Sequence, residues 1–241
     1  MDWLVRALYI AWKDIRVYYL KAPNLTYGLM MPVALYLAFG VTGQMNPGTL
    51  ISGLVSLVIL FGTMSIEAVA VVMEKQTRTM DRLMAAPVSP LTIVLGKALA
   101  GTFLGPLIAA AVLLPLTLYS GESIGSPLLV FLAIILSSFT FSALGVLVSS
   151  YAHWVPEAQM YANFLRFPMA FLAGTFVPLE AMPPWLQTAT KVLPLTYSVE
   201  ALRSAMGGGA TPTYILDMMA LALFSAAVVA ASALLLERSR G

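Results

Sequence analysis

The sequence contains no cysteine and only one histidine, His153, among its 241 residues. The missing thiols exclude a disulfide framework, a cysteine nucleophile and a cysteine metal site. With its single histidine in a polar loop beside Trp154, the chain offers no suitable base for a Ser–His hydrolytic site. It also lacks the phosphate-binding loop Gly-x-x-x-x-Gly-Lys-Ser/Thr, since Gly96 and Lys97 are followed by Ala98.

Charged residues are scarce as well, at 10% of the chain, whereas hydrophobic residues make up 60%. An average soluble domain is about 45–50% apolar and about 25% charged. A soluble fold of this size could not bury so much apolar surface, so the composition predicts an all-α integral membrane protein. The net charge of +2 is too small to indicate a nucleic-acid partner.

The first 22 residues predict an amphipathic helix that lies in the membrane interface. At 100° per residue, one face carries Leu4, Leu8, Ala11, Ile15 and Tyr19, and the opposite face carries Asp2, Arg6, Lys13 and Arg16. Because charges interrupt every apolar run, this stretch is not typical of a signal peptide.

Six segments have the length and apolarity of membrane spans, since about 20 apolar residues cross a hydrocarbon core about 30 Å thick. The predicted spans are residues 25–43, 50–73, 92–118, 127–149, 158–177 and 214–236. No polar insertion is long enough to form a second domain. Residues 1–241 are therefore predicted to form a single transmembrane domain.

Lysine and arginine are distributed unevenly between the two sides that these spans define. If the N-terminus is cytoplasmic, ten of the 13 Lys and Arg residues lie on the inner side. Lys191 and Arg203 lie on the outer side, and Arg166 lies within the fifth span. The positive excess on the inner side predicts a multi-pass plasma-membrane protein with both termini in the cytoplasm.

Residues 74–90, EKQTRTMDRLMAAPVSP, form a polar interruption between the second and third predicted spans. Within it, Met80, Leu83, Met84 and Pro87 recur at helical spacing and share one face, while the charges fall mostly on the other. A short helix with one apolar stripe is suited to lie on the membrane surface and dock into a groove of another protein. An ordinary solvated loop with some helical turns is the alternative.

Residues 178–212, between the fifth and sixth spans, are too apolar for a free loop and contain too many prolines for a span. We expect one or two short re-entrant or interfacial helices on the outer side, with their backbone shielded by protein. Glu200 and Arg203 are three residues apart and can form an ion pair on such a helix.

Two charged residues lie within predicted spans, Glu67 in the second and Arg166 in the fifth. A charge at mid-membrane costs about 2.5–3.5 kcal/mol, so such residues usually face the protein interior and pair. Both approach from the cytoplasmic side, so a Glu67–Arg166 pair is geometrically possible. It would either fix helix packing or serve a substrate path or gate. Lys97 is expected to extend its ammonium group to the inner surface.

The order of these features, together with three motifs, resembles the membrane subunit of type 2 ATP-binding-cassette (ABC) exporters, which serve drug, polyketide and polysaccharide export. The resemblance extends over nearly the whole chain. The first motif comprises Glu74, Lys75, Thr79, Asp81, Arg82, Leu83, Pro87, Val88 and Ser89. The second comprises Phe176, Pro178, Pro183, Trp185 and Leu186, and the third Pro194, Leu195, Thr196, Tyr197, Glu200 and Arg203.

One residue, Arg78, departs from the family pattern, because the family has glycine at this position. Arginine favours helix by about 0.8 kcal/mol over glycine. We therefore expect the surface helix to begin earlier here.

The resemblance implies that residues 74–91 form a cytoplasmic coupling helix that contacts a separate ATP-binding subunit. The implied contact residues are Glu74, Arg78, Thr79, Met80, Asp81, Leu83, Met84 and Pro87, with Met80, Leu83 and Met84 as the docking side chains. An extracellular gate or re-entrant segment would include Phe176, Pro178, Pro183, Trp185, Pro194, Tyr197, Glu200 and Arg203.

ATP and Mg would then bind to the partner subunit, and the permease itself would hold no cofactor or metal and have no catalytic residue. Two copies of the permease, or the chain and a paralogue, would enclose a path through the lipid membrane for a small amphiphile. The cargo would be drug-like, lipid-like or glycan-like. The alternatives are an ATP-independent secondary transporter, which would typically show repeated halves, and a membrane scaffold protein.

Overall fold

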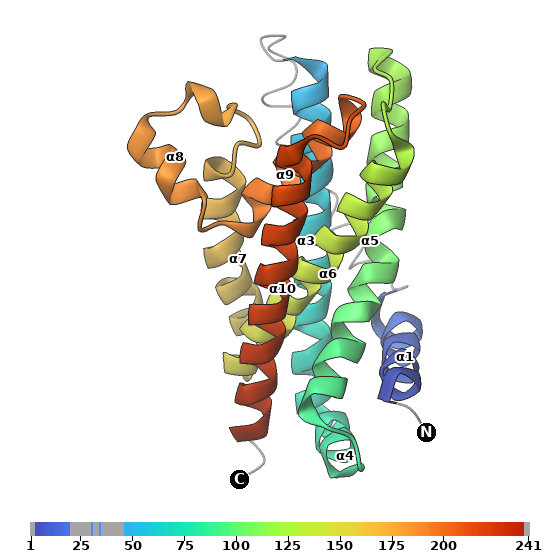
Figure 1. Ribbon diagram of the computed structural model, residues 1–241. Helices are drawn as coiled ribbons and strands as arrows, with labels where there is room; N and C mark the ends of the chain where they lie inside the picture. The colour runs from blue at the N-terminus through green and yellow to red at the C-terminus, as the bar shows by residue number, and fades with distance from the viewer. Residues whose placement is uncertain (1–2, 20–29, 31–33, 35–45, 239–241) are drawn as a thin grey trace.

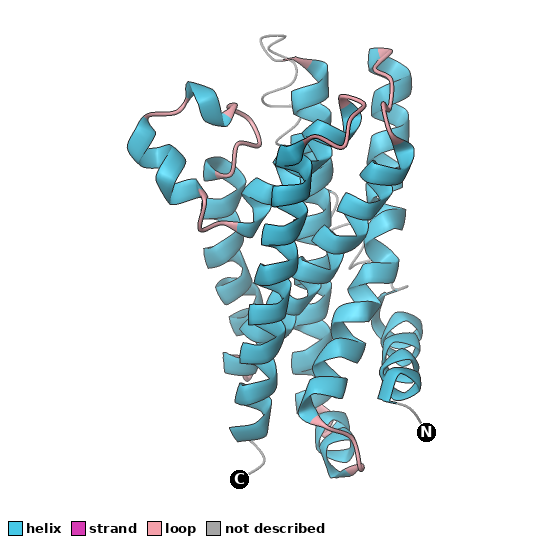
Figure 2. Ribbon diagram, in the orientation of Figure 1, coloured by secondary structure: helices cyan, strands magenta, loops and turns pink. Residues whose placement is uncertain are grey.

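A computed structural model describes residues 3–19, 30, 34 and 46–238, and all regular structure in these residues is helical (Figures 1 and 2). The longer elements are α1 (Trp3–Asp14), α3 (Pro47–Gln76), α5 (Pro90–Ser120), α6 (Pro127–Tyr151), α7 (Val155–Leu172), α9 (Pro194–Met206) and α10 (Pro212–Arg238). The short ones are the π-helical turn η1 (Ile15–Tyr19), α4 (Thr79–Ala85), the 3₁₀ turn η2 (Leu179–Ala181) and α8 (Pro184–Thr190).

Proline starts most of these helices. Its fixed φ is already helical, and its missing N–H would have no intrahelical partner in the first turn. Six helices begin at a proline, namely those starting at Pro47, Pro90, Pro127, Pro184, Pro194 and Pro212. The proline-rich stretch 178–212 therefore contains η2, α8 and α9, followed by the start of α10.

The bundle is built around α3. This helix packs against α5, α6, α7 and α9, and 94% of its most apolar 18-residue window is buried. Leu57, Ile59 and Leu60 point to different sides of α3, and all three are fully buried. A helix that is apolar on every side is stable when other helices or lipid surround it, and here other helices do.

Four helices in the described part of the chain are long and apolar enough to cross a membrane: α3, α5, α6 and α10. They correspond to the second, third, fourth and sixth predicted spans. The fifth predicted span, 158–177, overlaps α7, which begins three residues earlier, ends at Leu172 and carries Glu157, Gln159, Asn163 and Arg166. The first predicted span, 25–43, lies almost wholly outside the described residues. The count of six spans therefore remains a prediction.

The two ends of the bundle carry different elements (Figure 1). The start of α1, the helix α4 and the last turn of α10 lie at one end, at the bottom of the view, whereas α8 and α9 lie towards the other. The sequence predicted this separation from the distribution of Lys and Arg. That the lower end faces the cytoplasm stays a prediction.

Helix α1 packs against α5 through its small residues. Ala7, Ile10, Ala11 and Asp14 are buried, and a Cβ atom on Gly96 of α5 would lie only 2.8 Å from both the Ala7 carbonyl oxygen and the Ile10 Cβ. Glycine is therefore required at position 96 for this close approach.

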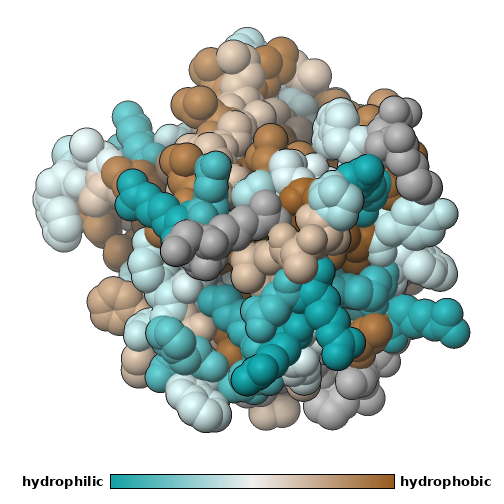
Figure 3. All heavy atoms as spheres, turned by 90° about the horizontal axis from the view of Figure 1, so that it is seen from below, coloured by the Kyte–Doolittle hydropathy of each residue, from teal (hydrophilic) through white to brown (hydrophobic). Residues whose placement is uncertain are grey.

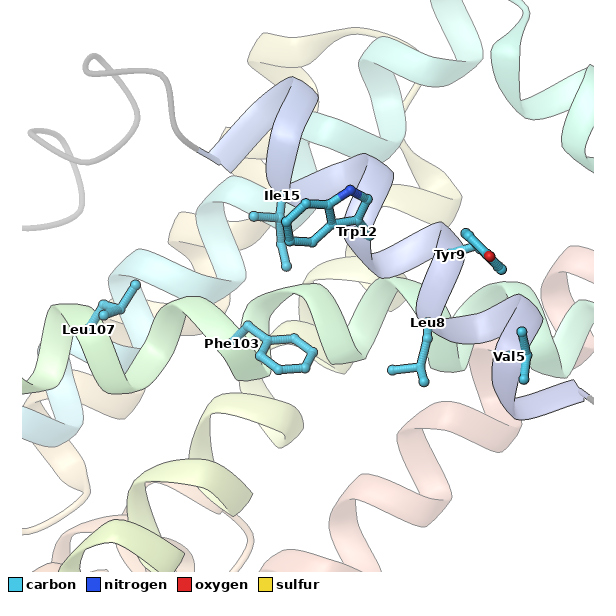
Figure 4. Close-up of a pocket in the computed structure, with 7 residues that line it drawn as sticks. All are labelled: Val5, Leu8, Tyr9, Trp12, Ile15, Phe103 and Leu107. Carbon is cyan, nitrogen blue, oxygen red and sulfur yellow. The ribbon is translucent and has the colours of Figure 1, made fainter.

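The large apolar residues of α1 stay outside this contact. They line an apolar groove of about 620 Å³ against Phe103 and Leu107 of α5, in which Leu8, Trp12 and Ile15 lie along the gap (Figure 4). Leu4 and Leu8 are about half exposed. Leu8 and Ile15 belong to the apolar face that the sequence predicted, whereas Ala11 of that face is buried. That this surface lies in the membrane interface stays a prediction.

Small residues also bring α5 and α6 together. Cβ atoms on Gly101 and Gly105 would lie 2.4 Å from Ser142 Oγ and 1.8 Å from Ser138 Oγ. The Gly-x-x-x-Gly spacing in α5 thus serves close helix packing.

Candidate functional site

The polar segment between α3 and α5 is divided into three parts. Helix α3 continues to Gln76, Arg78 has left-handed dihedrals (φ 57°, ψ 17°), and α4 occupies Thr79–Ala85. Ser89 then caps α5, its hydroxyl oxygen accepting a 3.2 Å hydrogen bond from the Thr92 N–H. The expectation of an earlier helix start was therefore wrong. A left-handed residue at position 78 interrupts the helix, and this is also the conformation for which glycine is suited.

Arg78→Gly is expected to stabilise the isolated chain slightly, by about 0.5–1 kcal/mol. Left-handed dihedrals cost a non-glycine residue about 1–2 kcal/mol, and the greater freedom of glycine in the unfolded chain offsets part of this gain. Thermal unfolding of the purified chain in detergent measures the shift. Arg78→Ala is the control, because alanine keeps the strain; an equal gain for alanine would contradict a backbone origin.

The apolar stripe of α4 faces the permease itself. Met80 is only 3% exposed and belongs to a buried cluster with Ile93, Val94 and Val146. Leu83 and Met84 are partly buried against the same cluster. The interpretation of Met80 as an outward docking side chain is therefore corrected. The α5, α6 and α10 side chains of the cluster form an apolar surface directly beneath α4, and burial there satisfies the stripe.

The outward face of α4 and its flanks is polar. The exposed residues are Gln76, Thr77, Arg78, Asp81, Arg82, Ala85, Pro87 and Ser89. Seen from this end, hydrophilic residues gather across the middle and lower part of the view, and hydrophobic residues dominate its upper part (Figure 3). One anion, Asp81, and one cation, Arg82, lie on α4, which packs on the core. This arrangement is suited to docking through hydrogen bonds and ion pairs rather than through hydrophobic contacts.

Glu74, the first residue of the polar segment, is fully buried at the end of α3. It belongs to a group that we call the buried ion cluster, made of Lys13, Asp14, Glu67, Glu74 and Lys97. Lys97 Nζ lies 2.5 Å from Glu74 Oε2, 3.1 Å from Asp14 Oδ2 and 4.0 Å from Glu67 Oε1. Lys13 Nζ lies 2.8 Å from Asp14 Oδ1 and also contacts Glu74 Oε1.

The two lysines keep the Asp14 carboxylate ionised. Burial by itself would raise the pKa of Asp14, but the ammonium groups of Lys97 and Lys13 outweigh this effect and lower the pKa below its usual value. Lys97 is 0% exposed. The expectation that it reaches the surface was therefore wrong, because α1 covers it and supplies a carboxylate partner.

Arg166, on α7, contacts a different face of α3 from the one that carries Glu67. The Arg166 guanidinium contacts the Ser65 hydroxyl, donates to Asn163 Oδ1 at 2.6 Å and lies 4.8 Å from the Phe61 ring centroid. Among the ion pairs between described residues none joins Glu67 to Arg166, and Glu67 lies beside Lys97 instead. Ser65 and Glu67 are two residues apart and hence about 200° apart around a helix, so α7 and α5 approach them from different sides.

Arg166→Met is expected to destabilise the chain by about 1–3 kcal/mol for each buried acceptor left without a donor. Ser65, Asn163 and Gln159 all contact the guanidinium. Arg166→Lys should recover part of this loss, since one ammonium group cannot replace the planar fork. Thermal unfolding measures both changes. Arg238→Met, at the exposed end of α10, is the control. A loss as small as that of the control would show that the polar contacts contribute no stability.

At the other end of the bundle, α9 is largely buried and α8 is largely exposed. The expected ion pair is present, with Arg203 Nη1 2.6 Å from Glu200 Oε1, and Arg203 Nη2 also donates to the Gly174 carbonyl at 3.1 Å. Burial raises the pKa of Glu200 above its usual value, and the Arg203 charge opposes this shift without cancelling it. Thus α9 is held to the residues that follow α7.

The remaining residues predicted for this end occupy different surroundings. Phe176 is buried, its ring 6.2 Å from that of Phe171, whereas Trp185 on α8 is 72% exposed. The Tyr197 hydroxyl donates to the Lys191 carbonyl at 2.7 Å. Pro178 and Pro183 precede η2 and α8, and Pro194 begins α9. These residues build a folded cap, and its role as a gate stays a prediction.

The sequence is similar to those of known transport proteins. A family model described as "ABC-2 type transporter" matches residues 3–206. ABC transporter G family member 20 of Dictyostelium discoideum is 32% identical over 161 residues, which cover 64% of this chain and 21% of that protein. Nodulation protein J of Neorhizobium galegae is 34% identical over 95 residues, 39% of this chain and 36% of that protein.

A third relative is matched over a longer part. The inner membrane transport permease YadH of Escherichia coli K12 is 24% identical over 167 residues, 69% of this chain and 65% of that protein. In each of these three comparisons the matched region is less than two thirds of the relative's length.

Proposed function

The chain belongs to the ABC-2 type transporter family, and from this membership and the geometry of α4 we propose that it is the membrane-spanning permease subunit of an ABC exporter. ATP and Mg bind and react on a separate nucleotide-binding subunit, which docks on α4. The permease itself catalyses no chemical reaction. Its task is to open the transport path first to one side of the membrane and then to the other.

The observation that carries this proposal is the position of α4. The helix connects two long apolar helices at one end of the bundle, presents a polar face outwards and packs its apolar stripe on the core. An ordinary solvated loop would have no buried residue such as Met80. A partner that moves α4 therefore moves the structure beneath it.

The mechanism follows from this packing. ATP binding draws two nucleotide-binding subunits together, and each pushes on an α4 helix. Met80 and its neighbours transmit the displacement to α5, α6 and α10. Helix α3, with 30 residues and a rise of 1.5 Å per residue, is about 45 Å long and carries the movement across the membrane. Tightly packed helices shift between discrete arrangements rather than deform continuously.

A second permease, identical or a paralogue, completes the path, because a single bundle with so buried a central helix encloses no wide channel. The cargo is an amphiphile of drug-like, lipid-like or glycan-like character that enters from the membrane. Exposed aromatic residues on α7, among them Tyr161, Phe164 and Phe171, provide an apolar surface for such a molecule.

Purification of the tagged chain from its native membranes, followed by labelling with a photoreactive ATP analogue, tests this proposal. The expected result is a co-purifying subunit that takes the label and hydrolyses ATP, while this 25.8 kDa chain takes none. Transport by reconstituted permease alone, driven by an ion gradient, would instead show a secondary transporter. A chain that binds neither an ATPase nor cargo would be a membrane scaffold.

A further inference from the structure

Helix α1 contacts the α4 segment on both of its flanks. Lys13 contacts Glu74, in the last turn of α3 before α4, and the Arg6 guanidinium donates to the Pro87 carbonyl, just after α4. The distance in sequence is large, 61 and 81 residues. An interfacial helix at the start of the chain therefore touches the entrance and the exit of the candidate docking helix.

Lys97 joins these contacts to the core of the bundle. It comes from α5, yet its closest ionic partners lie on α1 and α3, namely Asp14 and Glu74. Both carboxylates and Lys97 are 0% exposed. The cluster thus ties three helices together at one point, next to the place where α3 leads into α4.

An ionic contact is not the most stable way to fill this space. Removing charges from water costs several kcal/mol per ion, and apolar residues of similar volume are often equally stable. In some proteins, however, buried ionic groups hold a unique register, because a shifted helix would leave buried charges without partners. Close packing of Ala7 and Ile10 on Gly96 fixes the same register sterically.

We propose that α1 is a brace for α4, held in register by the buried ion cluster, so that α1 and α4 move together as one body during transport. The part of this proposal that concerns transport rests on the proposed function. The structural part, that Lys13 and Asp14 fix α1 relative to α4, does not.

The structural part is tested by distance measurement between two spin labels. The chain has no cysteine, so Tyr9→Cys on α1 and Ala85→Cys on α4 provide the only labelling sites, and both positions are exposed. The test variant is Lys13→Met with Asp14→Asn. It removes both α1 members of the cluster at no change in net charge and leaves the Lys97–Glu74 pair in place.

In lipid nanodiscs, the distribution of distances between the two labels should be narrow in the otherwise unaltered chain. In the test variant this distribution should be broad. Glu180→Gln with Lys191→Met is the matched control, since it removes one exposed charge of each sign at the other end. If the test variant fails to fold, Arg6→Met, which removes only the contact with Pro87, replaces it. An unchanged narrow distance in the folded variant overturns the brace.

The functional part is tested with the ATPase partner purified as described above. Loss of the brace should reduce transport per ATP hydrolysed by at least about fivefold, the lower range of coupling between distant sites, while the partner stays bound. If the labels separate but coupling is unchanged, the brace plays no part in transport and the proposal is overturned. If no ATPase binds even to the unaltered chain, the proposed function fails, and the label experiment still decides whether the brace exists.

Discussion

Replacement of Lys97 by methionine is expected to destabilise the folded chain by about 3–5 kcal/mol, the cost typical of removing one partner from a buried ion pair. Methionine has nearly the volume of lysine, so packing is preserved and the loss is electrostatic. Asp14, Glu67 and Glu74 would be left with Lys13 as the remaining cation of the buried ion cluster. Thermal unfolding of the purified chain in detergent, and its folded yield from membranes, measure the effect.

The control for this prediction is Lys191→Met, which removes an exposed lysine beyond α8 and should change stability by less than about 0.5 kcal/mol. Adding Asp14→Asn and Glu74→Gln to Lys97→Met should restore much of the loss, because the triple variant no longer buries those two carboxylates. If Lys97→Met is as stable as the control, the cluster carries no net electrostatic stabilisation.

Much of the fold could be predicted because the membrane imposes simple rules. Four of the six segments that apolar length identified correspond to helices long enough to span, and the Lys and Arg bias separated α1 and α4 from α8 and α9. The prolines of residues 178–212 indicated short helices, and the Glu200–Arg203 spacing gave an ion pair that is present. Each of these features depends on residues that are close together in the sequence, and for this reason it could be predicted.

The ionic contacts could not be predicted, since they depend on which helix faces which. Glu67 and Arg166 were the two charges deepest in the predicted spans, and pairing them was the simplest solution. The structure instead brings Lys97 to Glu67 and Glu74, with Asp14 arriving from a helix more than 80 residues away. One signal was available: Glu67 and Glu74 are seven residues apart and share a helix face, so a cation facing both was needed.

The orientation of α4 was missed for a related reason. The spacing of Met80, Leu83 and Met84 correctly indicated an apolar face, but a spacing cannot say whether the permease or a partner covers it. Helix propensity likewise favoured an early start at Arg78, whereas tertiary geometry requires a left-handed residue there.

Exchange of the two outward charges of α4, as Asp81→Arg with Arg82→Asp, is expected to reduce stimulation of the partner's ATPase activity by about tenfold or more. Close charge pairs in interfaces carry coupling energies of about 1.5–7 kcal/mol, and like charges placed together add repulsion. The exchange keeps the net charge and lies on exposed positions, so the stability of the chain alone should change by less than about 0.5 kcal/mol. ATP hydrolysis by the reconstituted complex, titrated with permease, measures the loss.

Variants of the apolar face of α4 distinguish a role in binding the partner from a role in packing on the core. Met80→Ala should cost about 2–5 kcal/mol of stability, as for other buried methionines, and should weaken coupling only through loss of the fold.

Leu83→Asp distinguishes the two faces most sharply. If the partner binds the apolar stripe after all, this variant will abolish stimulation while the charge exchange leaves it intact. If the polar face is the docking surface, the charge exchange uncouples a stable permease, whereas Leu83→Asp first destabilises α4, because the half-buried side chain packs on the core beneath it.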